Sequence, residues 1–270
     1  PRALLILFAT RLSHTALLNM DKPCCVGVVR DSTNLKGEMI ADIGGAPAYF
    51  TAPPGDAKTT GVLVLHDIFG FSIPNAKYIV DHFAGAGFPS IMGDFFVDTP
   101  SSLPNWPADE TEIKEELGTP SFFKWWGEIT SEAYWEVFHP RVTACVDYLK
   151  TKGCTKFCVI GFCWGGIAIE ELGKTGVFSQ GASCHGCHSG TDKFKAAKEK
   201  GLTISYHTVP GDDFFKVDVQ EALKAEGAVV ASYEGMYHGF VVRGDFAGNP
   251  ALKEASEKCL GDIVAQFSAA

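Results

Sequence analysis

The sequence predicts an α/β fold in which a mostly parallel β-sheet is covered by helices on both faces. Short apolar runs alternate with segments of helical periodicity from about residue 38 to the C-terminus. Apolar residues make up 46% and charged residues 20% of the 270 residues, which excludes a disordered chain, a coiled coil and a collagen-like fibre. No repeat or low-complexity linker interrupts the alternation, so we expect one domain over residues 20–270.

The first part of the alternation contains two predicted strands and one helix. The run Val-Leu-Val-Leu at 62–65 is typical of a parallel strand that is buried on both faces. A helix is predicted over 75–86, where Gly-Ala-Gly provides a stop signal, and a second strand over 88–92. Residues 98–127 are rich in Pro, Trp and acidic side chains without a clean period, which predicts an irregular, partly helical excursion.

The remaining elements alternate regularly. A long helix over 128–150 is followed by four strand–helix pairs: 156–161 with 164–172, 178–184 with 192–200, 203–209 with 217–226, and 228–233 with 252–267. A helix between two strands returns the chain to the end where the first strand began, so the second strand runs in the same direction and the two pair in parallel.

Charge and cysteine content restrict partners and compartment. The formal net charge is −9 and no run of four Lys or Arg occurs, so nucleic acid is not expected as a partner. No apolar stretch approaches the roughly 18–20 residues of a membrane helix, so no membrane association is expected. The nine cysteines are scattered, several in apolar runs, which indicates reduced thiols and a cytoplasmic protein.

Residues 1–19 are expected to lie outside the domain. The apolar run at 3–9 weakly imitates a signal or transit peptide, but it is at the lower length limit for one. Met20-Asp21-Lys22 reads like a natural start. We favour an extension foreign to the domain, with a cleavable targeting segment as the alternative.

The segment 157–166, Phe-Cys-Val-Ile-Gly-Phe-Cys-Trp-Gly-Gly, carries the main functional signal. It reads as a strand, a tight turn and a helix, which is a nucleophile elbow with Cys163 in place of serine. Gly161 and Gly165 avoid a collision between the turn and its neighbours. The helix N-terminus favours a thiolate, so the sequence predicts Cys163 as an ionised nucleophile. A tight turn without chemistry is the alternative.

An elbow nucleophile requires an acid and a histidine later in the chain. His238 follows the last predicted strand and precedes the final helix, where this arrangement presents its base. His207 lies within a predicted strand and is expected to be a hydrogen-bonded core residue. The acid is expected in the turn after the penultimate strand, which contains both Asp212 and Asp213. The developing oxyanion would meet the backbone N–H groups of Ile68 and Trp164.

Four motifs together resemble the dienelactone hydrolase family: Gly-Phe-Cys-Trp-Gly-Gly at 161–166, Asp-Asp-Phe-Phe at 212–215, His-Gly-Phe-x-x-Arg at 238–243 and His-Asp-Ile-Phe-Gly-Phe at 66–71. The resemblance runs from about residue 38 to the C-terminus. It implies an α/β-hydrolase fold and a Cys-His-Asp triad that cleaves small esters or lactones through a thioester, as in carboxymethylenebutenolidase. It also implies a monomer without a cofactor, and it favours Asp212 over Asp213 as the acid.

The resemblance further implies two residues around the nucleophile. Asp67 occupies the position of a carboxylate that interacts with the resting thiol, where bacterial members have glutamate. Arg243 corresponds to one of two arginines that hold a substrate carboxylate, although it stands five residues after the histidine rather than four. The second arginine is absent, because Val97-Asp98 follows the matching motif. Dienelactone itself is therefore less favoured as the substrate.

The segment Cys-His-Gly-Cys-His at 184–188 spells the attachment signature of c-type haem. We expect instead a strand end that opens into a loop near the site, with His185 facing the pocket. No metal is expected, since a Cys/His site requires ligands that converge tetrahedrally. Two other functions stay open: a non-catalytic binding module of the same fold, and a metal or redox protein that uses Cys184 and Cys187.

Overall fold

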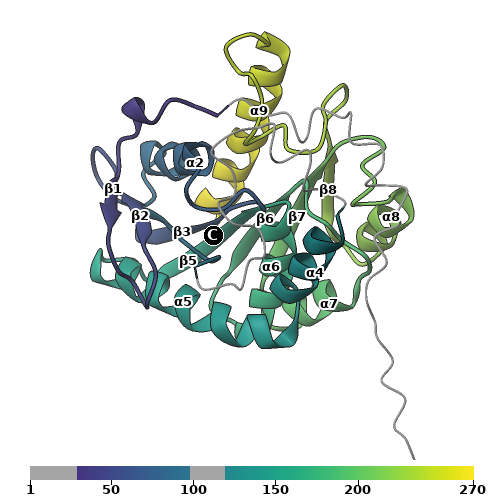
Figure 1. Ribbon diagram of the computed structural model, residues 1–270, viewed down its shortest axis with the longest axis horizontal. Helices are drawn as coiled ribbons and strands as arrows, with labels where there is room; N and C mark the ends of the chain where they lie inside the picture. The colour runs from purple at the N-terminus through teal and green to yellow at the C-terminus, as the bar shows by residue number, and fades with distance from the viewer. Residues whose placement is uncertain (1–28, 98–118) are drawn as a thin grey trace, which may run out of the picture.

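A computed structural model describes residues 29–97 and 119–270, and a single β-sheet forms its centre (Figure 1). Within these residues the sheet has eight strands in the order β1-β2-β4-β3-β5-β6-β7-β8. The strands are β1 (Glu38–Ile40), β2 (Ala48–Thr51), β3 (Thr60–Leu65), β4 (Ser90–Gly93), β5 (Lys156–Phe162), β6 (Gln180–Cys184), β7 (Thr203–Thr208) and β8 (Val229–Ser232). Neighbouring strands from β4 to β8 are parallel, whereas β1 and β2 are antiparallel additions at one edge.

Helices cover both faces of the sheet. They are α2 (Pro74–Gly85), α4 (Pro120–Ile129), α5 (Glu132–Thr151), α6 (Trp164–Leu172), α7 (Asp192–Glu199), α8 (Val217–Ala225) and α9 (Pro250–Ser268), with short 3-10 turns η2 (Ser32–Asn34) and η3 (Gly173–Thr175). Helices α2 and α9 contribute to the buried cluster on one face, and α4 to α8 contribute to the cluster on the other (Figure 1). The predicted fold class is therefore confirmed.

The two central strands are covered on both sides. Every residue of β3 is buried, and so is every residue of β5 except Lys156. Such strands can be apolar along their whole length, because no position faces water. This explains the continuous apolar runs in the sequence, and it places the end of β5 in the middle of the sheet.

The long helix predicted over 128–150 is wrong at its start. Helix α4 ends at Ile129, and α5 begins at Glu132. Ser131 separates them because its Oγ accepts a hydrogen bond from the Tyr134 backbone N–H at 3.2 Å, which caps the new helix. The part of the predicted excursion at 98–118 lies outside the described residues, as does the predicted extension at 1–19, so both stay predictions.

None of the helices in the described part of the chain combines the length and the apolar composition that crossing a membrane requires.

Candidate active site

Cys163 lies at the sharp turn between β5 and α6. Its backbone has φ 52° and ψ −110°, a strained conformation for a residue with a side chain. A Cβ atom at position 161 would lie 2.3 Å from the carbonyl oxygen of Gly165, and one at position 165 would lie 2.6 Å from that of Leu65. Glycine is therefore required at both positions, as the motif predicts.

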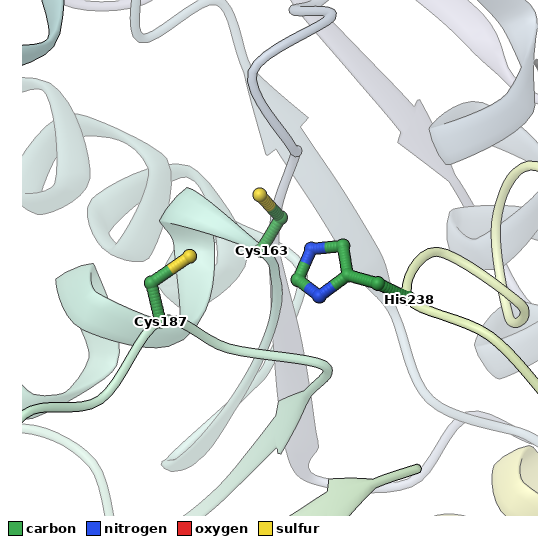
Figure 2. A group of neighbouring side chains, drawn as sticks. All are labelled: Cys163, Cys187 and His238. Atoms are coloured by element: carbon green, nitrogen blue, oxygen red, sulfur yellow. The ribbon is translucent and has the colours of Figure 1, made fainter. Parts of the chain in front are cut away.

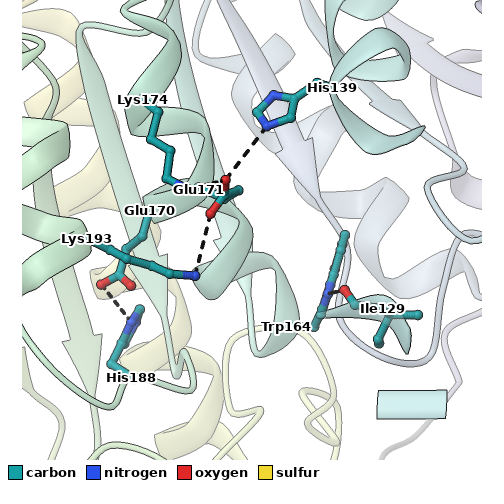
Figure 3. A network of polar contacts seen from close by, with 8 residues as sticks. All are labelled: Ile129, His139, Trp164, Glu170, Glu171, Lys174, His188 and Lys193. Carbon is teal, nitrogen blue, oxygen red and sulfur yellow. Dashed lines mark hydrogen bonds and ion pairs between the residues drawn. The ribbon is translucent and has the colours of Figure 1, made fainter. Parts of the chain in front are cut away.

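Trp164 fixes the start of α6 beside the thiol. Its ring is buried, and its Nε1–H donates to the carbonyl of Ile129 at 3.1 Å, which ties α6 to the end of α4 (Figure 3). As the first residue of the helix, Trp164 has a backbone N–H with no acceptor inside that helix. That N–H group is available at the turn where Cys163 stands.

Asp212 and His238 meet at the end of the sheet. His238 lies in the turns after β8, and its Nδ1–H donates to Asp212 Oδ2 at 2.9 Å. The other carboxylate oxygen accepts the backbone N–H of Phe214 at 3.0 Å. Asp212 is buried, whereas Asp213 is exposed. The structure thus brings Asp212 to the imidazole, the residue that the family resemblance favours.

A second thiol stands beside Cys163. The sulfur atoms of Cys163 and Cys187 and a ring nitrogen of His238 all lie within 4.8 Å of one another. Figure 2 shows the three side chains converging from separate segments of the chain. Both cysteines are partly exposed. The sequence analysis noted Cys187 only as part of the haem-like motif and missed its place beside Cys163, because a loop position after a strand does not reveal which neighbour it faces.

The surroundings shift the pKa values of both His238 and Cys163. Burial alone would lower the pKa of His238, but the charge and hydrogen bond of Asp212 raise it well above its usual value. A hydrogen bond with Cys187 and burial raise the pKa of Cys163 well above its usual value, and the nearby His238 offsets this only in part. The hydrogen bond with Cys187 and burial thus oppose ionisation of the Cys163 thiol, and His238 favours it.

The loop after β3 contains Asp67, Ile68 and Phe69, and the buried side chain of Arg243 packs against it. Asp67 is buried, and its Oδ1 accepts the Phe69 backbone N–H at 2.9 Å. Burial raises the pKa of Asp67, and the charge of Arg243 opposes this. The Arg243 guanidinium lies 3.6 Å from the centroid of the Phe69 ring. Asp67 and Arg243 are therefore neighbours, and the backbone N–H of Ile68 lies in the same loop.

Two nitrogen atoms of the buried Arg243 guanidinium are unpaired in the described part of the chain. Arg243 is only 1% exposed, and within the described residues its Nε and Nη2 have no hydrogen-bond partner. A buried guanidinium with unpaired donors is costly unless an acceptor reaches it, so it favours an anionic group at this place.

His66 links the same loop to the segment after β4 through hydrogen bonds. The Phe95 backbone N–H donates to its Nε2 at 3.3 Å, which leaves Nδ1–H to donate to the Asp67 carbonyl at 2.8 Å. Its ring stacks on Trp164 with centroids 5.7 Å apart. His66 thus holds the loop in place while its own nitrogens are both used.

His185 is fully buried and lies against His238. Its ring contacts the His238 ring edge-on, with centroids 5.0 Å apart. In the described structure both ring nitrogens lack a hydrogen-bond partner, and burial lowers the pKa of His185 well below its usual value. The structure brings His185 to the site through its contact with His238.

The other residues of the haem-like motif face elsewhere. Cys184 lies 4.0 Å from the sulfur of Cys259 on α9, on the opposite face from α6. His188 contacts Ser183 at 2.8 Å and Glu170 at 3.0 Å (Figure 3). Cys184 and Cys187 therefore have different neighbours and do not form one cluster.

His207 is the core residue that the sequence predicts. It is 4% exposed, and its two ring nitrogens lie 3.0 Å from the hydroxyl groups of Ser205 and Tyr233. The hydrogen bonds satisfy the ring, which leaves His238 as the histidine beside Cys163.

Known structures share this fold. A putative dienelactone hydrolase from Klebsiella pneumoniae matches with a TM-score of 0.59 at 17% identity, over 86% of this chain and 97% of that one. A monoglyceride lipase variant from Saccharomyces cerevisiae matches with a TM-score of 0.58 at 10% identity, over 90% of this chain and 96% of that one. At these identities the likeness shows the α/β-hydrolase fold alone.

Sequence comparison is more specific. A carboxymethylenebutenolidase homolog from Homo sapiens is 29% identical over 249 residues, which are 90% of this chain and 94% of the relative. Hydrolase pyvD from Aspergillus violaceofuscus is 28% identical over 229 residues, which are 82% and 86% of the two chains. The sequence pattern named "Dienelactone hydrolase family" matches residues 46–270. The chain therefore belongs to the dienelactone hydrolase family, a family of hydrolases.

Proposed function

We propose that this chain hydrolyses small esters or lactones through a thioester on Cys163. The observation that supports this best is the order Asp212, His238, Cys163 along one line of contacts. A nucleophile, a base within reach of it and an acid that orients the base are the parts that acyl transfer needs. The family and its relatives support hydrolysis as the class of reaction.

The first half-reaction transfers the acyl group to sulfur. As the Cys163 sulfur attacks the carbonyl carbon, His238 takes the thiol proton, and the backbone N–H groups of Ile68 and Trp164 receive the carbonyl oxygen as it becomes an anion. His238 then gives its proton to the departing alcohol oxygen, and the carbon–oxygen bond breaks. Asp212 keeps the imidazole in the tautomer that this requires.

The second half-reaction releases the acid. Water attacks the thioester while His238 accepts one of its protons, and the proton passes to sulfur as the carbon–sulfur bond breaks. Because the pKa of His238 is raised, its neutral, basic form becomes more populated as pH rises. Activity is therefore expected to increase as the pH rises through the raised pKa of His238.

Arg243 and Asp67 suggest the kind of substrate. The unpaired donors of Arg243 suit a carboxylate on the ester or lactone, and Asp67 beside it is a counter-charge that such a group would displace. Since the second family arginine is missing, we expect substrates with one acidic group held from one side only.

The assay is hydrolysis of p-nitrophenyl acetate, followed by a panel of lactones with and without a carboxylate. Cys163→Ala is expected to abolish turnover, and iodoacetamide is expected to inactivate the protein with label on Cys163. Wild-type turnover in Cys163→Ala, or full activity with Cys163 labelled, would contradict the proposal. A wild-type protein that hydrolyses no ester or lactone would favour the non-catalytic binding module.

Asp212→Asn and Asp213→Asn form a matched pair of variants. Asp212→Asn should lower kcat by roughly a hundredfold or more, because the imidazole loses the partner that fixes its tautomer. Asp213→Asn, at an exposed position, should lower kcat far less than Asp212→Asn, which removes the carboxylate that His238 contacts. The reverse order of the two effects would assign the acid to Asp213.

A further inference from the structure

Cys187 has no part in the steps above, yet it stands beside the residues that carry them. Among the described residues, the one cluster of His, Cys, Asp and Glu atoms with the spacing of metal ligands is Cys163, Cys187 and His238. Two thiols and an imidazole are the ligands that zinc and other thiophilic cations prefer.

The distances suit a tetrahedral ion after a small contraction. Zinc–sulfur bonds of about 2.3 Å and zinc–nitrogen bonds of about 2.0 Å place the ligand atoms of a tetrahedron roughly 3.5–3.8 Å apart. The three atoms here lie within 4.8 Å of one another. The ligand atoms must therefore approach one another by up to about 1 Å to hold an ion.

The surroundings of His238 match those of a metal-binding histidine. Its Nδ1–H is already donated to Asp212 at 2.9 Å, and Figure 2 shows the other ring nitrogen turned towards Cys163. A carboxylate behind the imidazole fixes the tautomer and increases the basicity of the free nitrogen, as it does in many zinc sites. The contact that orients the base thus also prepares it as a ligand.

The cluster is reachable from solvent. Cys163 and Cys187 are partly exposed, in contrast to the other cysteines in the described part of the chain, which are buried. An ion can therefore enter, and its fourth position stays open for water. Each thiol loses its proton to solvent as its sulfur binds the ion, so binding strengthens as pH rises.

We propose that Cys163, Cys187 and His238 form a binding site for a thiophilic divalent cation, and that bound Zn²⁺ blocks hydrolysis by occupying the attacking sulfur and the base. The site differs from the Cys184 and Cys187 pair that the sequence suggested, since Cys184 lies against Cys259. The blockade rests on the proposed function, whereas the binding of the ion does not.

The binding arm uses Cd²⁺, whose thiolate complexes absorb in the near ultraviolet. Metal-stripped wild type, Cys187→Ala and the matched control Cys154→Ala are titrated with Cd²⁺ alone, and thermal melts confirm that each variant is folded. We expect at least a tenfold weaker Cd²⁺ affinity in Cys187→Ala and no change in Cys154→Ala, which removes a buried cysteine outside the cluster. Equal titrations of wild type and Cys187→Ala would overturn the site.

The inhibition arm measures ester hydrolysis against Zn²⁺ concentration, with each variant normalised to its own rate without metal. The Zn²⁺ concentration for half inhibition should rise at least tenfold in Cys187→Ala, and a chelator should restore the wild-type rate. Equal Zn²⁺ sensitivity in both proteins would overturn the blockade. If the wild type hydrolyses no ester, the proposed function fails, and the Cd²⁺ titration still decides the site.

Discussion

At the scale of single residues, the buried imidazole ring of His185 has no hydrogen-bond partner among the residues that the structure describes. The ring contacts the rings of Phe162 and Phe240, with centroids 5.8 and 6.2 Å apart, and its backbone has a positive φ of 41°. Burial lowers the pKa of His185 well below the value of 6.5 that applies to an unfolded chain. The unfolded state therefore binds a proton that the folded state does not, and the free energy of unfolding falls as pH drops below about 6.5.

We expect His185→Phe to weaken this pH dependence, because phenylalanine fills the aromatic surroundings without a proton to take up. Between pH 7 and pH 5 the wild type should lose stability more steeply than the variant, by up to about 1.4 kcal/mol per pH unit. Urea unfolding at several pH values measures the slopes. His139→Gln is the control, since His139 is partly exposed. Parallel slopes for wild type and His185→Phe would show that His185 does not carry the effect.

The sequence identified the main residues of the candidate site because their positions follow from local rules. A cysteine between two glycines at a strand–helix turn marks Cys163, and a histidine after the last strand marks His238. The choice between Asp212 and Asp213 depended on the family resemblance, since both lie in one turn. The contact of Cys187 with Cys163 could not be predicted, because it depends on how two separate loops pack together.

At the scale of elements, Glu171 joins three segments around α6, the helix that follows Cys163. Its buried carboxylate lies 2.6 Å from Lys174 on η3, 3.5 Å from Lys193 on α7 and 4.0 Å from His139 on α5 (Figure 3). The two lysine side chains are exposed along part of their length, and their ammonium groups lie near the buried carboxylate. One buried charge therefore links α6 to η3, α7 and α5.

Glu171→Gln should lower the free energy of unfolding by about 1–3 kcal/mol, the range for losing hydrogen bonds to a buried charged group. Glu199→Gln is the matched control, because Glu199 is exposed on α7 and should change stability by less than about 0.5 kcal/mol. Chemical denaturation measures both. Equal stability of the two variants would mean that the lysines act independently of Glu171.

Helices and strands could be predicted from the sequence where their own residues show a clear apolar run or helical period. The parallel strands and most helices follow from apolar runs and helical periodicity, and their observed bounds differ by few residues from those expected. The break at Ser131 was missed because the apolar spacing continues across it. The strands β1 and β2 were both missed. The three residues of β1 are exposed or half-exposed, so they show no buried alternation, and β2 has only four residues.

At the scale of the whole molecule, the sheet separates two apolar clusters and is protected most strongly in its middle. Strands β3 and β5 pair with neighbours on both sides and are buried, whereas β8 is an edge strand with exposed and half-exposed residues. Exposing the backbone of the central strands to water requires both apolar clusters to separate. The free energy of this opening therefore approaches that of global unfolding.

Amide hydrogen exchange should therefore be slowest in β3 and β5 and much faster in β1 and β8. Mass spectrometry of peptides from the labelled protein measures the exchange of each segment. Comparable exchange across the described sheet would contradict the picture of a protected centre, and the unfolding free energy from urea gives the limit that the slowest amides should approach.

Hydrogen bonds continue past the ends of the strands and link the site into the sheet. The backbone N–H of Cys163 donates to the Cys184 carbonyl at 3.1 Å, and that of His185 to the His207 carbonyl at 2.7 Å. Tyr233 does the same to Thr208 at 3.0 Å. The main chain at Cys163, His185 and Tyr233 is thus hydrogen-bonded to the neighbouring strand or its continuation. Anyone who wishes to redesign this scaffold should therefore leave the main chain of these three junctions unaltered.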